Sequence, residues 1–199
     1  MGLSSGRKSE TSATIRVIFS AHGPGPRWHY RVELNFERGR NVKELKIRQF
    51  AMSDAQACCI VINAAVVDMD GVNEAARRHI VSANTPERLG HDLAQWFSLV
   101  AEHDGTVVGV GALDKGEIKR VYVHPAAKSC GIGARLLTGL EAKAIALGLT
   151  EVTLDASPSS TGFYEAVGYT TQRDGGFSIG DADFTYVTMT KTLAGSPPC

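Results

Sequence analysis

Hydrophobic and polar residues recur with a clear period near the start of the chain. Between residues 28 and 36, apolar side chains occupy every second position, which predicts a half-buried strand. The apolar run at residues 14–19 and the Gly-Pro-Gly-Pro sequence at residues 23–26 fit a preceding strand and a turn. We therefore expect a β-hairpin here. It could pair between the subunits of a homodimer, cover its own sheet, or be an extension without function.

A longer pattern of mixed helices and strands begins at residue 45. Ser53 and Asp54 precede an apolar run and suit the N-cap of a helix, and Thr85 and Pro86 suit the start of another. The expected elements are a strand at 46–50, helices at 54–67, 73–81 and 85–95, strands at 97–102, 106–113 and 117–124, a helix at 136–147, a strand at 152–156, a short helix at 161–167, and a strand pair at 169–173 and 184–193. The fold class is therefore α+β with a mixed sheet.

The same pattern divides the chain into three parts. Residues 1–44 form an N-terminal extension with a disordered start, because residues 1–13 are small and polar. Residues 45–193 form one compact domain, and residues 194–199 form a C-terminal tail. A chain of 199 residues with 43% hydrophobic content can bury one sizeable core. We therefore expect one functional site.

Charge and cysteine content exclude several classes of function. The formal net charge is zero and the sequence pI is near 7.0, so the bulk charge points to neither nucleic acid nor an anionic membrane as a partner. No apolar window is long enough to span a membrane, and a cytoplasmic location is the default expectation. The four cysteines show no C-x-x-C spacing, so neither a disulfide framework nor a metal site is expected.

The stretch that carries chemistry follows the strand expected at residues 117–124. Val121, Tyr122 and Val123 precede a proline, and the segment from Lys128 to Arg135 contains two glycines just before the leucine-faced helix. Helix N-termini present unpaired N–H groups and partial positive charge, so this layout suits an anion cradle. Two glycines alone would be a weak signal, since ordinary loops use glycine for positive φ.

The combination of motifs resembles the GNAT superfamily of N-acetyltransferases. That family has the signature Q/R-x-x-G-x-G/A after a strand that ends in V-x-V-x-P, and a later F-Y-x-x-x-G-F/Y element. Here the later element is Phe163-Tyr164-Glu165-Ala166-Val167-Gly168-Tyr169. The resemblance covers about residues 46–193 and departs at Lys128, where the family usually has arginine or glutamine. Lysine keeps the charge but loses bidentate geometry.

The resemblance implies a GNAT fold and acetyl-CoA as cosubstrate. In that fold helices flank a mixed, mostly antiparallel central sheet, and splayed central strands form the acetyl-CoA cleft. The backbones of Val121 and Val123 would pair with pantetheine, and backbone amides of the loop would hold the pyrophosphate. The implied cofactor-binding residues are Val121, Tyr122, Val123, Lys128, Ser129, Cys130, Gly131, Ile132, Gly133, Ala134 and Tyr164.

The resemblance also implies the catalytic groups. Acetyl transfer to an amine needs a neutral amine, a polarised carbonyl and a stabilised thiolate. Tyr164 stands at the family's position for the general acid, and its alternative role is aromatic packing. Glu117 stands where some members have a glutamate that acts as base directly or through water. Its alternative role is an exposed residue at a strand start, with a water chain as the base. A backbone N–H of Val121 or Val123 would polarise the carbonyl.

Other interpretations stay open at this point. Cys130 lies at an expected helix N-terminus, where cysteines can be reactive, but the sequence offers no clear partner base. His79 and His91 are twelve positions apart without a paired cysteine, so we expect no metal there. A non-catalytic acyl-CoA sensor or interaction module would keep the cradle without transferring an acetyl group.

The acceptor is expected to be a small-molecule or peptide amine. It would be selected by residues 68–84 and by the loop before the last strand, which holds Asp174, Asp181 and Asp183. This acidic run suits a cationic amine, although acidic runs usually face water. The identity of the amine and the oligomeric state are not fixed by the sequence.

Overall fold

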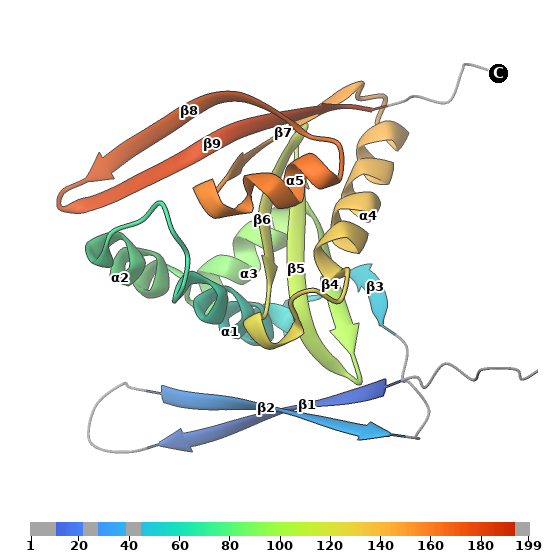
Figure 1. Cartoon of the computed structure of the whole chain (residues 1–199), viewed down its shortest axis with the longest axis vertical. Helices are drawn as coiled ribbons and strands as arrows, with labels where there is room; N and C mark the ends of the chain where they lie inside the picture. The colour runs from blue at the N-terminus through green and yellow to red at the C-terminus, as the bar shows by residue number, and fades with distance from the viewer. Residues whose placement is uncertain (1–10, 22–27, 39–44, 194–199) are drawn as a thin grey trace, which may run out of the picture.

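The chain folds into a mixed sheet with helices on both faces (Figure 1). The computed structural model describes residues 11–21, 28–38 and 45–193. The strands are β1 (Thr11–Ala21), β2 (Trp28–Arg38), β3 (Lys46–Gln49), β4 (Phe97–His103), β5 (Thr106–Asp114), β6 (Glu117–Val123), β7 (Glu151–Ala156), β8 (Thr170–Ile179) and β9 (Ala182–Thr192). The helices are α1 (Ala55–Val66), α2 (Glu74–Ala83), α3 (Pro86–Gln95), α4 (Ile132–Ala146) and α5 (Thr161–Ala166), with short 3-10 turns η1 (Met52–Asp54), η2 (Pro125–Ala127) and η3 (Pro158–Ser160). The α+β class predicted from the sequence is confirmed.

The described strands form two separate sheets. β1 and β2 pair with each other in antiparallel fashion, with Val17 opposite Val32. The other strands form a seven-stranded sheet in the order β3-β4-β5-β6-β7-β9-β8. Neighbouring strands within this sheet are antiparallel, except β6 and β7, which are parallel. The turn expected at residues 23–26, residues 1–10 of the start expected to be disordered, and the tail at 194–199 lie outside the described residues. Residues 11–13, which were expected to belong to the disordered start, are part of β1.

Alternating side chains give the large sheet a core on each face. Along β4, Leu99 and Ala101 belong to the cluster that packs against α4, whereas Val100 belongs to the cluster around α1 and α3. All three are buried, as expected for a sheet covered by helices on both sides. None of the helices in the described part of the chain is both long and apolar enough to cross a membrane.

Two of the helix starts predicted from the sequence are confirmed by their capping bonds. The Asn73 side chain accepts a 2.8 Å hydrogen bond from the Ala76 N–H at the start of α2. Thr85 Oγ1 accepts one of 3.3 Å from the Arg88 N–H at the start of α3. Such bonds satisfy backbone donors that a helix leaves unpaired in its first turn. They fix the ends of the α1–α2 and α2–α3 connections.

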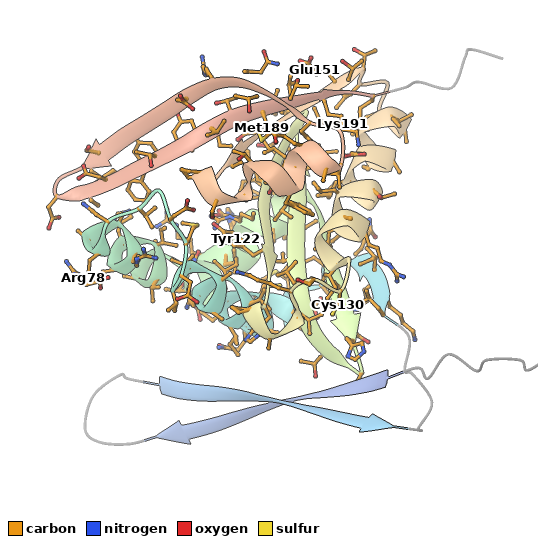
Figure 2. The ribbon with its side chains drawn as sticks, viewed as in Figure 1. Arg78, Tyr122, Cys130, Glu151, Met189 and Lys191 are labelled. Carbon is orange, nitrogen blue, oxygen red and sulfur yellow. The ribbon has the colours of Figure 1, made fainter. Side chains whose placement is uncertain are left out.

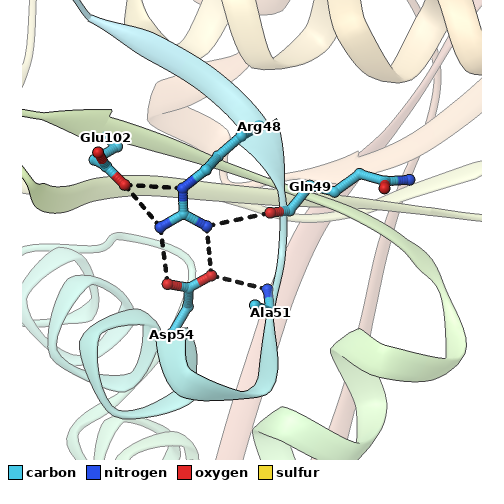
Figure 3. A network of polar contacts seen from close by, with 5 residues as sticks. All are labelled: Arg48, Gln49, Ala51, Asp54 and Glu102. Carbon is cyan, nitrogen blue, oxygen red and sulfur yellow. Dashed lines mark hydrogen bonds and ion pairs between the residues drawn. The ribbon is translucent and has the colours of Figure 1, made fainter.

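Asp54 does not cap α1 with its side chain, contrary to the expectation from the sequence. Its carboxylate instead accepts hydrogen bonds from Arg48 Nη1 at 2.7 Å, Arg48 Nη2 at 2.9 Å and the Ala51 N–H at 2.8 Å (Figure 3). Arg48 also donates through Nε to Glu102 at 2.8 Å. The bond from Arg48 holds the pKa of Asp54 below its ordinary value. This network ties β3, the start of α1 and β4 together.

The final strand pair is longer than the sequence predicted. β8 runs through Asp174 to Ile179, and a tight turn around Gly180 leads directly into β9. The segment interpreted as an acidic loop is therefore mostly strand. Phe177 on β8 stacks on Phe184 on β9 with ring centroids 4.6 Å apart, and cross-strand aromatic pairs of this kind stabilise a hairpin.

Candidate active site

A cavity opens where β6 and β7 part. The two strands are parallel neighbours, but the register pairs only Glu117 with Thr153 before they diverge. The cavity between them has a volume of about 670 Å³ and is lined by β6, β7, the end of α1 with the loop after it, the loop before α4, and α5. Strands that diverge leave backbone N–H and C=O groups without ladder partners. The cavity therefore offers hydrogen bonds to an extended ligand.

The loop before α4 forms one end of this cavity. Ser129 and Gly131 both adopt left-handed conformations, with φ of +65° and +72°. The first hydrogen bond of α4 runs from the Arg135 N–H to the Gly131 carbonyl, so the N–H groups of the first helical turn are available as donors. Turns of this kind followed by a helix N-terminus make a concave site for an anion.

The two glycines of this loop have different physical roles. A Cβ added to Gly131 would meet nothing within 4 Å, so its space is open toward the cavity. A Cβ added to Gly133 would lie 2.9 Å from Cζ of Phe163. Gly131 therefore leaves open space beside the backbone of this loop. Gly133 instead allows the Phe163 ring of α5 to lie against α4.

Tyr164 lines the same cavity from α5. Its side chain is only 7% exposed, and its ring packs edge-on against Phe163 and Tyr169 at centroid distances of 5.0 and 5.7 Å. Burial, with a smaller effect of Tyr122, raises its pKa well above the usual value for tyrosine. The phenol is therefore neutral over the whole pH range in which the protein would work and can donate a hydrogen bond.

The β6 residues expected to meet the cofactor also border the cavity. Val121, Tyr122 and Val123 all line it, and Figure 2 shows Tyr122 near the middle of the molecule beside β6 and below α5. Burial raises the pKa of Tyr122. Among the predicted loop residues, Lys128, Ser129, Gly131, Ile132 and Gly133 line the cavity as well, whereas Cys130 and Ala134 do not.

Glu117 is not brought to the cavity. It lies at the β5–β6 turn, opposite Asp114, and its carboxylate forms an ion pair of 3.0 Å with Lys119 Nζ. The side chain is 47% exposed. Glu117 is not among the described residues that line the cavity, and its role as a base stays a prediction.

The other side chains weighed in the sequence lie apart from one another. Cys130 is exposed, with Sγ 3.6 Å from the Lys128 carbonyl oxygen. His79 packs edge-on against Phe184, whereas His91 contacts the Gln95 amide. Burial raises the pKa of Cys58 to about 12 and that of Cys59 to about 11. These two thiols in α1 therefore remain protonated and act as small hydrophobic groups.

Comparison with known proteins decides the family. A family model described as "Acetyltransferase (GNAT) domain" matches residues 64–193. The chain belongs to the GNAT acetyltransferase family. The match extends from the last turn of α1 to just past the end of β9 and includes every residue that lines the cavity in the described part of the chain.

Solved structures of GNAT proteins share the fold. A GCN5-related N-acetyltransferase from Rhodopseudomonas palustris is 25% identical with a TM-score of 0.70, covering 78% of this chain and 99% of the other. PaiA N-acetyltransferase from Thermoplasma acidophilum, solved in complex with coenzyme A, is 17% identical with a TM-score of 0.61, covering 75% and 99%. A phosphinothricin acetyltransferase from Sinorhizobium meliloti, solved with acetyl-CoA, is 19% identical with a TM-score of 0.55, covering 78% and 93%.

A curated relative matches over a shorter stretch. The protein named IAA acetyltransferase from Azospirillum brasilense is 41% identical over 86 residues, which are 40% of this chain and 53% of the relative. This GNAT chain therefore spans about half the length of that curated relative.

Several residues that line the cavity were missed by the sequence reasoning. The charged ones are Arg120 and Asp155, and three serines of the loop before α5 accompany them, whereas Asp68 belongs to the segment 68–84 that was expected to select the acceptor. The acidic run expected to select the acceptor lies elsewhere. Asp183 receives hydrogen bonds from Asn73 and Ser178 at the β8–β9 turn, and no residue of that run lines the cavity within the described part of the chain.

Proposed function

We propose that this protein transfers the acetyl group of acetyl-CoA directly to a primary amine, with both substrates bound at once. One observation carries the proposal: the anion cradle before α4 and the buried phenol of Tyr164 open into the same cavity, beside the free edge of β6. A transferase needs the cradle, the phenol and the strand edge together, because the cofactor must be anchored at one end and react at the other. Membership of the GNAT family supports the same chemistry.

The residues of the cavity would divide the binding of acetyl-CoA between them. The N–H groups of Ile132 and Gly133 would hold the pyrophosphate, and Lys128 would add positive charge. The free edge of β6 would pair with pantetheine through Val121 and Val123. The open space at Gly131 fits a bulky anion close to the backbone.

The reaction balances without a covalent enzyme intermediate. The amine nitrogen attacks the thioester carbonyl, a C–N bond forms, the C–S bond breaks, and the amine loses one proton while the thiolate gains one. A backbone N–H of Val121 or Val123 would stabilise the oxyanion. Tyr164, neutral because burial raises its pKa, would donate its O–H to the departing thiolate. The proton that the amine loses would pass through water and restore the Tyr164 phenol, so the enzyme ends unchanged. Free CoA and an N-acetyl product result.

Two glycine substitutions test whether the cradle binds the cofactor. Gly131 and Gly148 have nearly the same φ, +72° and +77°, and a Cβ at either would meet nothing within 4 Å. Gly131→Leu and Gly148→Leu therefore introduce the same backbone strain, but only the first places a side chain at the cavity. By calorimetry we expect Gly131→Leu to weaken acetyl-CoA binding at least about tenfold, whereas Gly148→Leu keeps the wild-type affinity.

Turnover is then measured on an amine panel by detecting free thiol. Thiol released only when amine is present supports direct transfer. Binding of acetyl-CoA without turnover on any amine would favour an acyl-CoA sensor instead. If the two glycine variants lose affinity equally, the cradle assignment is wrong.

A further inference from the structure

A β-bulge in β6 includes Arg120, one of the residues that line the cavity. The pairing with β5 skips one position, so that Arg120 and Val121 both lie opposite Gly111. Arg120 has a φ of +55° in the middle of a strand, a conformation that is unfavourable for any residue except glycine. Strained residues of this kind persist only where the surrounding structure holds them, and they concentrate at functional sites.

The guanidinium of Arg120 is fixed on one side and accessible on the other. Nη1 donates to Asn84 Oδ1 at 3.3 Å, and Nη2 donates to Asp92 Oδ2 at 3.1 Å. The Trp96 ring lies under it, 5.9 Å from Cζ. These contacts use two of the five N–H groups that a guanidinium carries. The side chain is still 29% exposed, and Arg120 is one of the residues that line the cavity, so the guanidinium has N–H groups left for a further anion.

The end of the cavity away from the cradle carries both signs of charge. Arg120 supplies a cation there, and Asp68 and Asp155 supply carboxylates. Asp155 accepts a 2.8 Å hydrogen bond from Thr188 Oγ1, which holds it at the point where β7 leaves β6. A site with an arginine and two carboxylates complements a zwitterion better than a plain cation or anion.

A short segment restricts the size of what can enter at this end. We name residues 67–73, between α1 and α2, the α1–α2 strap. Asp70 in the strap accepts hydrogen bonds from the N–H and Oγ of Ser159, both at 2.7 Å, and the carbonyl of Gly71 accepts the Thr185 N–H. The strap is thus joined to both the loop before α5 and β9. An acceptor bound beneath it has to be small.

Resting on the function proposed above, we infer that the acceptor is a small amine that carries a carboxylate next to the amino group, as a free α-amino acid does, and that Arg120 binds this carboxylate. The carboxylate of an α-amino acid is two bonds from the nitrogen that attacks. Its receptor must therefore lie beside the backbone that binds the thioester carbonyl. Arg120 directly precedes Val121, one of the two expected oxyanion donors, and meets this requirement.

The test compares α-amino acids with their primary amides, which keep the amine but lack the carboxylate. We expect wild-type protein to prefer the acids, and Arg120→Gln to lower kcat/KM for them by about 30-fold or more, mainly through KM. Activity on the amides should change less than about threefold. Asp92→Asn is the control, because it breaks the same ion pair but keeps the arginine, and it should retain the preference for acids.

Each outcome decides between the explanations. Equal losses on acids and amides in both variants would show that Arg120 only supports the fold and would overturn the inference. Turnover of amides with no preference for acids would also overturn it, while leaving acetyl transfer intact. If no amine is turned over, calorimetry of the amino acid panel on CoA-saturated protein decides. If amino acids bind to the wild type and Arg120→Gln abolishes this binding, the inference is supported. If amino acids do not bind to the wild type, the inference is contradicted.

Discussion

The role of Tyr164 can be isolated by removing one oxygen atom. In Tyr164→Phe the ring would still pack against Phe163 and Tyr169, but the O–H donor for the leaving thiolate would be lost. Because general acids contribute about 10²–10⁴-fold, we expect kcat to fall by about 10² or more while the Kd for acetyl-CoA stays the same. Steady-state thiol release and calorimetry measure the two quantities.

A second tyrosine provides the matched control. Tyr169 donates its O–H to Glu141 Oε1 at 3.0 Å and does not line the cavity. Tyr169→Phe should therefore lower stability slightly without changing kcat. If both variants lose the same fraction of kcat, the effect of Tyr164→Phe comes from packing and Tyr164 is not the acid.

Asp54 makes stability depend on acid pH. Its pKa is lowered chiefly by the hydrogen bond from Arg48, so its stabilising contribution is present above the unfolded value of about 3.9 and is lost as pH falls through the lower folded value. Asp54→Asn should cost about 1 kcal/mol at pH 7, a modest figure because Arg48 is 37% exposed and water screens the pair. Urea unfolding at pH 7 and pH 3 checks this.

The difference between wild type and Asp54→Asn should shrink at pH 3. Glu74→Gln is the control, because Glu74 is 72% exposed in its pair with Arg78 and exposed helix pairs contribute little. If the difference in unfolding free energy between wild type and Asp54→Asn is the same at pH 7 and pH 3, the charge of Asp54 does not contribute to stability.

At the level of elements, the α1–α2 strap should control access of the acceptor. Gly71 has φ +76°, and a Cβ there would lie 2.5 Å from the Thr185 carbonyl oxygen and 2.7 Å from Pro158 Cδ. Gly71→Ala must therefore displace the strap from β9 and the loop before α5. We expect KM for the acceptor to rise about tenfold or more, since small misplacements at a site are costly, while acetyl-CoA binding is unchanged.

Gly105→Ala separates displacement from strain. Gly105 also has φ +76°, but a Cβ there would meet nothing within 4 Å. Gly105→Ala should lose about as much stability as Gly71→Ala loses through backbone strain at positive φ. It should keep the wild-type KM for the acceptor. Equal KM values in the two variants would show that the strap does not restrict the acceptor.

The elements also show why part of the site could be predicted from the sequence and part could not. The cradle and Tyr164 come from motifs that are continuous in sequence, so local patterns are sufficient to find them. The position of Arg120 depends on the pairing of β6 with β5, which a continuous sequence motif does not specify. One signal was present: Ile118 and Val121 face the same core cluster although they are three positions apart, and such a break in the period of two indicates a bulge.

Two residues lie elsewhere than the sequence suggested, for a similar reason. Glu117 stands as many positions before the cofactor-loop signature as the glutamate base of some family members. It lies at the β5–β6 turn, where it forms an ion pair with Lys119. Asp174 was assigned to a loop. In the structure it belongs to β8, where it pairs with Val187 of β9. In both cases sequence distance to a motif did not determine the direction of the side chain or the length of a strand, because pairing with distant residues decides these.

At the scale of the whole molecule, the described residues of the cavity all belong to the domain after residue 44. Each described residue that lines the cavity lies between Ala65 and Tyr164, the family model begins at residue 64, and β1 and β2 form a sheet separate from the seven-stranded one. A chain of residues 45–199 should therefore fold with its core clusters intact. We expect its Kd for acetyl-CoA to stay within about twofold of the full chain, because the groups that bind the cofactor are unchanged.

Light scattering on the same two chains tests the role expected for the extension. If β2 pairs between subunits, the full chain has twice the mass per particle expected for one chain, and the shortened chain does not. In either case the affinity for acetyl-CoA should be the same, since the cavity lies within one chain. A shortened chain that is folded by circular dichroism but binds acetyl-CoA tenfold more weakly would contradict the domain boundary at residue 45. It would instead place part of the binding energy in residues 1–44, which the cavity lining gives no reason to expect.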